Sequence, residues 1–153
     1  MKLLVEWRKP FRLKRSRRDY PTYGLDLERL PGEPGVYVFG RRWGSQFEAL
    51  YVGRANMIRQ RVRSQMNNHR LMQHLKAAKA GKRILLAGCL TTKPGQQIDQ
   101  CLPLVERALI RYFLSEGHDL VNKQGTRLRR HELVFTGKHP KRFLPALMFV
   151  EKN

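Results

Sequence analysis

The sequence predicts one small α/β domain in which helices flank a central, mainly antiparallel sheet of three strands. Its 153 residues suit one domain, and a hydrophobic fraction of 41% is enough for one core. Short segments rich in β-branched and aromatic residues alternate with longer ones whose apolar residues recur at helical spacing. We expect a basic extension at 1–34, a core at 35–125, and a basic extension at 126–153 that packs on the same domain.

The N-terminal extension begins with a short predicted strand at residues 3–7. Residues 8–18 follow and carry seven Lys and Arg side chains. A basic arm of this kind either wraps a phosphate backbone or stays solvated, and the sequence favours neither alternative. The Pro and Gly residues at 31–35 end the extension.

Two strands open the core. Residues 35–40 and 48–55 have the composition of strands, and residues 41–47 are predicted to form the loop or hairpin turn between them. A connection this short makes the two strands antiparallel. Trp43 and Phe47 lie in the predicted loop, where packing is the expected role and stacking on bases is the alternative.

Two helices and a third strand come next. Asn56 is a suitable N-cap residue, and apolar residues recur after it at helical spacing up to Met66. A second helix is predicted over 71–80 and ends at Gly81. Residues 84–90 are a short apolar run, which predicts a central strand.

The last helix of the core has the strongest periodicity, with an apolar stripe from Ile98 to Phe113. Proline fits best in the first turn of a helix. Pro103 therefore predicts a helix from about Leu102 to Glu116, preceded by a turn.

The C-terminal extension contains two possible strands, at 132–135 and 144–150. We expect the second to pair with residues 3–7 and so to bring the two ends of the chain together. Such a pairing would place both extensions on one domain.

Charge is the strongest bulk signal. Thirty-one Lys and Arg against twelve Asp and Glu give a net charge of +19 and a pI near 10.9. This favours a polyanionic partner, most often nucleic acid. The alternative is a ribosomal or architectural protein that binds without chemistry. No apolar run approaches the roughly 20 residues of a membrane-spanning helix, so we expect a cytoplasmic protein with no membrane partner.

The two cysteines, Cys89 and Cys101, lie in apolar surroundings and do not form a C-x-x-C pair. We predict that both are buried thiols. The five histidines are scattered along the chain, so a zinc site is not expected.

The two core strands carry paired tripeptides, Gly35-Val36-Tyr37 and Tyr51-Val52-Gly53. Arg54 follows the second tripeptide directly, and Arg61 lies eight residues after Gly53 on the next predicted helix. Glu106 lies in the later helix, and Asn122 follows that helix. In order and spacing, the pattern from residue 35 to 122 resembles the GIY-YIG nucleases. It is closest to the amino-terminal nuclease module of the excision-repair incision subunit and to stand-alone restriction and homing enzymes.

The resemblance implies a GIY-YIG-type fold and a metal-dependent endonuclease. It places one metal-binding carboxylate at Glu106, for Mg²⁺ or Mn²⁺. It also assigns catalytic roles to the following residues: Tyr37, Tyr51, Arg54, Arg61, Glu106 and Asn122. The chain departs from the repair module at Gln65, where that module has a tyrosine. It also departs in the separation of Glu106 and Asn122, which are sixteen positions apart, longer by about one helical turn.

Physical chemistry supports the same site. Phosphodiester hydrolysis needs an activated water and positive charge near the developing phosphorane. Arg61 can form a fork to phosphate oxygens, and one carboxylate suffices for a magnesium ion that keeps most of its waters. We hypothesise that Tyr37 or Tyr51 orients or deprotonates the water. Gly35 and Gly53 are interpreted as structural glycines that permit close backbone approach.

Further cations are candidate phosphate contacts, which attract nucleic acid independently of its sequence. These are Arg41, Arg42, Arg59, Arg63, Arg70, Arg129 and Arg130. DNA is the expected substrate, with RNA left open, and the protein is expected to act as a monomer or homodimer. The competing hypothesis is a non-catalytic DNA-binding protein on a degenerate nuclease fold.

Overall fold

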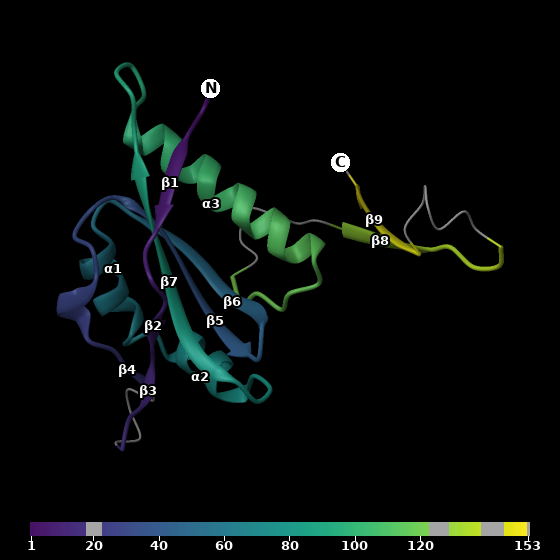
Figure 1. Ribbon diagram of the computed structural model, residues 1–153, viewed down its shortest axis with the longest axis horizontal. Helices are drawn as coiled ribbons and strands as arrows, with labels where there is room; N and C mark the ends of the chain where they lie inside the picture. The colour runs from purple at the N-terminus through teal and green to yellow at the C-terminus, as the bar shows by residue number, and fades with distance from the viewer. Residues whose placement is uncertain (18–22, 123–128, 139–145, 153) are drawn as a thin grey trace. The chain divides into compact units, whose positions relative to one another are not determined.

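The computed structural model describes residues 1–17, 23–122, 129–138 and 146–152 (Figure 1). The chain forms two compact units, residues 1–122 and residues 123–153. The first unit holds an antiparallel sheet and three α-helices, which agrees with the predicted class of fold. No helix among the described residues is long and apolar enough to cross a membrane.

The sheet of the first unit has five strands, two more than predicted. Its centre is β5 (Gly35–Trp43), which pairs with β6 (Gln46–Ala55) on one side and β7 (Lys82–Thr91) on the other. The far edge of β7 pairs with β1 (Leu4–Trp7) and then with β2 (Phe11–Arg12), so the N-terminal segment joins the sheet (Figure 1). All of these pairings are antiparallel.

The connection between β5 and β6 is shorter than predicted. Trp43 pairs with Gln46, so the strands continue through the expected loop and meet at a two-residue turn. Gly44 takes a φ of 55° in this turn, a left-handed conformation that suits glycine. A bulge next to Phe39 places Leu50 as an extra residue in β6.

Two helices cover one face of the sheet. They are α1 (Ile58–Gln65) and α2 (His69–Ala77), and their buried side chains pack with Tyr37, Phe39 and other strand residues in the main core cluster. The prediction of Asn56 as the N-cap of α1 was one residue off. Met57 occupies that position and gives no side-chain cap, while the first helical N–H, of Ile58, donates to the Glu33 carbonyl at 3.1 Å.

The opposite face packs against α3 (Ile98–Ser115), through Ile110 and Phe113 against Val38 and Val52. The predicted start near Leu102 was wrong, because α3 begins four residues earlier and contains Pro103 in its interior. A proline there removes one backbone donor. In the first turn of α3, Ile98 packs beside the buried Cys101 and Leu102. The early start of the helix thus coincides with apolar contacts.

The rest of the basic arm is folded onto the first unit. Here β3 (Lys14–Arg15) pairs with β4 (Tyr23–Gly24), and the short 3-10 helix η1 (Leu27–Arg29) leads toward β5. Leu13 is buried between the cationic residues on either side of it. Residues 8–17 therefore belong to the folded unit, and their Lys and Arg side chains are exposed on it.

The second unit contains one hairpin, formed by β8 (Arg129–Val134) and β9 (Leu147–Lys152). The prediction that the last strand pairs with residues 3–7 was wrong. That last strand pairs with β8, and β1 pairs with β7. Both terminal strands consist mostly of apolar residues, so their composition alone did not distinguish the partners.

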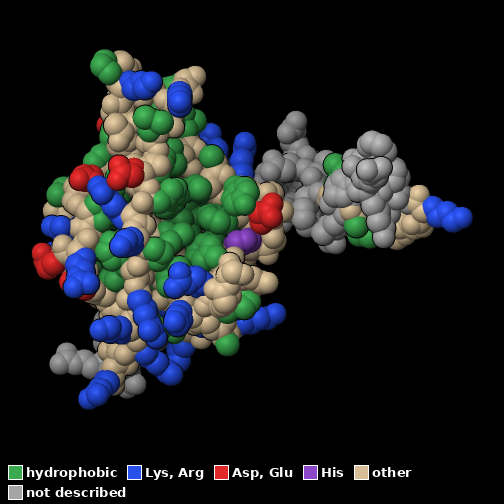
Figure 2. Space-filling view, viewed as in Figure 1, with side chains coloured by type: hydrophobic (Ala, Val, Ile, Leu, Met, Phe, Trp, Pro, Cys, Tyr) green, Lys and Arg blue, Asp and Glu red, His purple; other side chains and the backbone are tan. Residues whose placement is uncertain are grey.

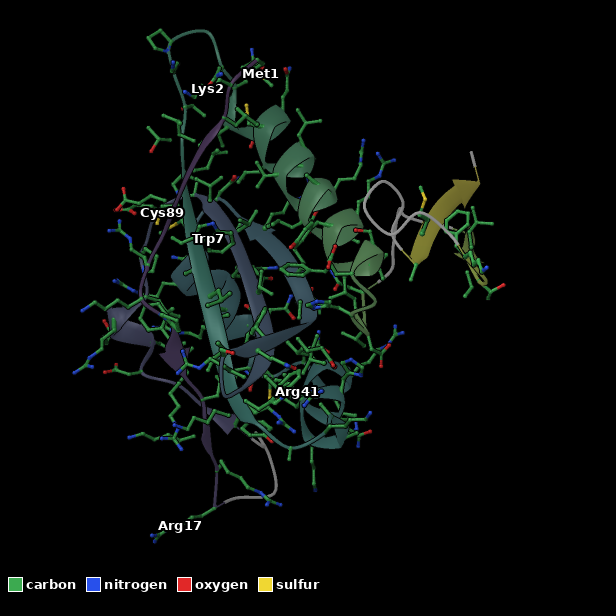
Figure 3. The ribbon with its side chains drawn as sticks, turned by 45° about the vertical axis from the view of Figure 1, so that its right-hand side comes forward. Met1, Lys2, Trp7, Arg17, Arg41 and Cys89 are labelled. Atoms are coloured by element: carbon green, nitrogen blue, oxygen red, sulfur yellow. The ribbon has the colours of Figure 1, made fainter. Side chains whose placement is uncertain are left out.

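The two cysteines, Cys89 and Cys101, are free and buried, as predicted. Cys89 lies in β7, and Trp7 lies in the neighbouring strand β1 (Figure 3).

Candidate functional site

The two motif tyrosines lie side by side on the sheet face that α1 covers. Tyr37 extends from β5 and Tyr51 from β6, with their rings stacked at a centroid distance of 6.2 Å and an interplanar angle of 18°. Tyr37 is fully buried, whereas Tyr51 is half-buried at the margin of the core. Only Tyr51 therefore has part of its side chain accessible to solvent.

The two motif glycines provide space for this arrangement. Gly53 is the cross-strand partner of Tyr37, and a Cβ at Gly53 would lie 2.3 Å from Cζ of Tyr37. A Cβ at Gly35 would lie 2.0 Å from the carbonyl oxygen of Gly88 on β7. Both positions thus exclude any larger side chain, in line with the close approach inferred from the sequence.

A buried amide from α1 joins the two tyrosines. Gln65 Nε2 lies 3.1 Å from the hydroxyl oxygen of Tyr37 and 3.0 Å from that of Tyr51, and it donates to both. Asn68 donates from Nδ2 to Gln65 Oε1 at 2.9 Å. Asn68 also caps α2, because its Oδ1 accepts from the backbone N–H of Leu71.

Arg61 brings positive charge to the tyrosine pair. Burial raises the pKa of Tyr37 strongly and the neighbouring Tyr51 raises it further, while hydrogen bonds from Gln65 and Arg61 act in the opposite direction. Arg61 is exposed on α1, so its guanidinium contacts both the buried tyrosine and solvent. It is thus positioned to contact a bound anion beside the pair.

Glu106 lies across the end of β6 from these groups. Its carboxylate forms an ion pair with Arg54 Nε at 3.3 Å, and its side chain is 25% exposed. Burial raises the pKa of Glu106, while the charges of Arg54 and Arg61 lower it. The two arginines and the carboxylate therefore form one electrostatic cluster.

A hollow of about 440 Å³ lies beside this cluster. Its lining combines the end of β6, the start of α1 and the first turns of α3. The lining residues are Arg54, Ala55, Asn56, Arg61, Asp99, Leu102 and Pro103. Two arginines and one acid, Asp99, line the hollow, and Glu106 pairs with Arg54 beside it. Arg61 is therefore the arginine whose charge can attract an anion such as a phosphate.

The outer edge of β6 is covered by the segment that follows α3. The amide of Asn122 exchanges hydrogen bonds with Val52, accepting from its N–H at 3.1 Å and donating to its carbonyl. The Val121 N–H donates to Leu50 O at 2.8 Å, and His118 Nδ1 accepts from the Ala49 N–H at 2.7 Å. Asn122 thus anchors this segment to the strand that carries Tyr51.

The predicted phosphate contacts separate into two groups. Arg41 is not a surface cation. It is 6% exposed, and its guanidinium donates to the Ala80 carbonyl at 2.8 Å and to Glu48 at 2.9 Å (Figure 3). Its Cζ also lies 3.9 Å from the ring centroid of Trp43, and Phe47 packs against Phe113, so both aromatic residues have packing partners. This geometry contradicts a phosphate-binding role for Arg41.

Arg59 is also engaged, because it donates to the carbonyls of Leu30 and Glu28 and so holds the N-terminal segment. The other cations of the first unit, Arg42, Arg63 and Arg70, are exposed, although Arg63 forms an ion pair with Glu28 at 3.6 Å. Arg129 and Arg130 lie in β8, and their side chains fall outside the described part of the structure.

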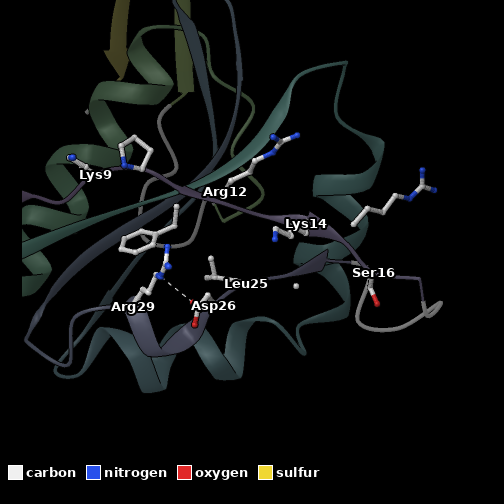
Figure 4. A pocket seen from close by; sticks show the side chains of 11 residues that line it. Lys9, Arg12, Lys14, Ser16, Leu25, Asp26 and Arg29 are labelled. Carbon is white, nitrogen blue, oxygen red and sulfur yellow. Dashed lines mark ion pairs between the residues drawn. The ribbon is translucent and has the colours of Figure 1, made fainter.

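Cations of the basic arm at residues 8–18 line a groove. The groove has a volume of about 750 Å³ and lies between β2, β3 and η1 (Figure 4). Its charged lining residues are Lys9, Arg12, Lys14, Arg15, Asp26 and Arg29, and the single acid is paired with Arg29 at 3.2 Å. In Figure 2, Lys and Arg side chains gather over this end of the unit.

Whether the site suits magnesium depends on the side chains that could bind the ion. Within the described residues, no three His, Cys, Asp or Glu side chains group together as a metal site. Glu106 alone fits a magnesium ion that keeps most of its waters and shares phosphate oxygens. Its accessible, partly buried carboxylate beside the arginine-lined hollow is compatible with that mode of binding.

The residue missed in the sequence was Gln65. In the sequence this position stands out only by its departure from the tyrosine of the repair module, yet Gln65 contacts both motif tyrosines. The available signal was its spacing of four from Arg61, which puts both side chains on the same face of α1.

The chain was also compared with known proteins. No protein-family model, no curated protein and no solved structure matches it.

Proposed function

We propose that the protein is a metal-dependent endonuclease of the GIY-YIG type, which hydrolyses DNA phosphodiester bonds. The observation that carries this proposal is the position of Arg61, which contacts Tyr37, the ring partner of Tyr51, and lies close enough to Glu106 for its charge to lower the pKa of that carboxylate. These residues come from β5, β6, α1 and α3, and each was expected at the site from the sequence. A separate packing role for each residue would not by itself place Arg61 next to both the tyrosine pair and Glu106.

The arginines would bind the scissile phosphate. Arg61 and Arg54 line the same hollow, and both guanidinium groups reach solvent. Guanidinium groups offer paired N–H donors that match the non-bridging oxygens of a phosphate. Such contacts stabilise the negative charge that develops as water attacks phosphorus.

We assign the water-orienting role to Tyr51. Its side chain is half-buried, so its oxygen can meet a water, whereas Tyr37 is fully buried and burial raises its pKa. Tyr37 would then support the ring of Tyr51 and hold Arg61 in place.

Glu106 would hold the metal. A bound Mg²⁺ or Mn²⁺ supplies positive charge that activates water and stabilises the leaving oxygen. The ion pair with Arg54 holds the Glu106 carboxylate beside one of the arginines that line the hollow. Asn122 would act by fixing the edge of β6 rather than by contacting substrate.

Nicking of supercoiled plasmid tests the proposal. We expect the wild-type protein to nick DNA with Mg²⁺ or Mn²⁺, and to stop doing so in EDTA. Glu106→Ala should abolish nicking while retaining DNA binding, and Glu116→Ala, an exposed glutamate at the end of the same helix, should leave nicking unchanged.

A different outcome would favour the competing hypothesis. If the wild-type protein binds DNA but cuts none of a set of varied, branched and single-stranded DNA and RNA substrates with either metal, the fold serves binding alone. The charge of +19 is the observation behind that alternative.

A further inference from the structure

The tyrosine pair depends on an amide whose orientation the surrounding hydrogen bonds determine. Three residues take part besides the tyrosines: Gln65, Asn68 and Leu71. An amide oxygen and nitrogen have similar shapes, so their assignment must follow from their partners. Here the chain of partners begins at a group whose role is fixed.

The Leu71 backbone N–H is that group, because it can only donate. It donates to Asn68 at 3.1 Å, so the acceptor must be the Asn68 oxygen. The Asn68 NH₂ must then be the group that faces Gln65 at 2.9 Å, and it needs the Gln65 oxygen as its acceptor. The Gln65 NH₂ is left to face the two tyrosines.

We propose that Gln65 is a positioning residue for the tyrosine pair, and that it acts by donating one N–H to each phenolic oxygen. An NH₂ group has two protons, and the two contacts at 3.1 and 3.0 Å use both. Each tyrosine oxygen therefore accepts on the side of α1. The phenolic proton of Tyr51 must point away from Gln65, where it can be given to a solvent base or to a substrate oxygen.

The same contacts stabilise the ionised form of Tyr51. A phenolate oxygen only accepts hydrogen bonds, and a donor already in place needs no rearrangement when the proton leaves. Gln65 is 6% exposed, so little water can replace its N–H groups. The role of Gln65 in catalysis rests on the proposed nuclease function, but the orientation of its amide can be tested without any cleavage.

Asn68→Asp is the most direct test, because the changed residue does not touch either tyrosine. One aspartate oxygen still accepts from Leu71, and Asp is as good an N-cap as Asn, so α2 keeps its start. The other oxygen now needs a donor from Gln65, which turns the amide over. The Gln65 oxygen would then face the tyrosines, and the phenolic protons would turn inward to it.

Two variants complete the set. Gln65→Met has a similar shape and removes both donors without adding charge. Asn67→Asp adds the same charge as Asn68→Asp at the neighbouring exposed position and is the matched control for a simple effect of charge.

The measurement is the ionisation of Tyr51, followed by NMR of protein labelled at tyrosine Cζ, with Tyr51→Phe to assign the signal. We expect the acid dissociation constant of Tyr51 to fall about tenfold or more in Gln65→Met, the size typical for losing one hydrogen bond to a charged oxygen. Asn68→Asp should shift it in the same direction, and by several-fold more than Asn67→Asp.

The proposal is overturned if Gln65→Met leaves the acid dissociation constant within about twofold of wild type in a folded protein, or if Asn68→Asp and Asn67→Asp have equal effects. The rate of nicking as a function of pH gives the second readout. In Gln65→Met, the increase of this rate with pH should occur at higher pH than in the wild type. If the wild-type protein does not cut DNA at all, the proposed function fails, but the NMR titration still decides the role of Gln65.

Discussion

Replacement of Gly53 by alanine is the sharpest test of how the site is built. The added Cβ would lie 2.3 Å from Cζ of Tyr37, 2.4 Å from its hydroxyl oxygen and 2.8 Å from Cε2. Ordinary contacts between carbon atoms begin at about 3.5 Å. The ring of Tyr37 must therefore move by about 1 Å, or the strands must separate.

Neither movement is easy, because the ring has no free space around it. Tyr37 is 0% exposed, with Phe39 at 5.9 Å and Tyr51 at 6.2 Å between ring centroids. Overpacking of a core typically costs about 1–3 kcal/mol. Displacement of the hydroxyl also weakens its hydrogen bond with Gln65, worth about 0.5–1.5 kcal/mol. We expect Gly53→Ala to lower the free energy of unfolding by about 2–4 kcal/mol.

Urea unfolding followed by circular dichroism measures this change, with Gly32→Ala as the matched control. Gly32 is exposed and has nothing within 4 Å of its Cβ position, so the control should stay within about 0.5 kcal/mol of wild type. A loss below about 1 kcal/mol in Gly53→Ala would refute the described packing of Tyr37. Under the proposed function, nicking should also fall at temperatures where the variant remains folded.

Three further changes test other parts of the molecule. Asn122→Ala removes both bonds to the Val52 backbone and should cost about 1–3 kcal/mol of stability, measured by urea unfolding. Arg83→Met removes four donated bonds to carbonyls at the end of α2 and in the segment that follows it, so we expect a loss of about 2–4 kcal/mol; a stable variant would contradict that anchoring role. Lys14→Ala should reduce the slope of log binding constant against log salt by about 0.9 if the basic groove contacts DNA, whereas an unchanged slope would place the DNA elsewhere.

The sequence was most informative where structure is local. The strands around Tyr37 and Tyr51, and their shared face, follow from strand composition, a short connection and the period of two. Helices α1 and α2 follow from apolar spacing in the same way. Their boundaries shifted by a few residues because a cap can be replaced by a tertiary contact, as Glu33 does for Ile58.

What could not be predicted depends on contacts between distant segments. The pairing of β1 and β2 with β7 joins residues more than seventy positions apart, and no local pattern specifies it. The burial of Arg41 was missed for a related reason. Once β5 and β6 meet at a two-residue turn, Arg41 faces Glu48 across the strands, but the sequence had placed both near a loop.

The same limit applies to the candidate site. The motif indicated Arg61 and Glu106 by their order in the chain, whereas the bonds from Gln65 to both tyrosines depend on where α1 crosses the sheet. The sequence does not show whether an arginine is exposed or engaged in the fold. Only the structure shows that Arg41 and Arg59 bond to other parts of the chain, whereas Arg42 and the other predicted phosphate contacts of the first unit are exposed.

The contact between His118 and the edge of β6 depends on pH. Its Nδ1 accepts from the Ala49 N–H at 2.7 Å, a bond that requires the neutral ring. Burial lowers the pKa of His118 below its usual 6.5, while the charges of Glu48 and Glu116 act in the opposite direction. The folded protein therefore binds this proton less readily than the unfolded chain does.

The sign of the effect follows from that difference. Above about pH 6.5 the histidine is neutral in both states and its contribution to stability is complete. As the pH falls below 6.5 the unfolded chain gains a proton first, so the free energy of unfolding decreases until the folded-state pKa is passed. Each unit of pKa difference corresponds to about 1.4 kcal/mol.

Urea unfolding of the wild type and His118→Gln between pH 5 and 8 measures this contribution. Glu106, whose pKa burial raises, contributes a slope of the opposite sign at lower pH, but it is present in both proteins and cancels in their difference. We expect the stability gap between the two proteins to narrow as the pH falls below 6.5. A gap that stays constant over this range would mean that His118 takes up its proton equally in both states. Because the same segment carries Asn122, loss of the His118 contact should also loosen the edge of the strand that holds Tyr51.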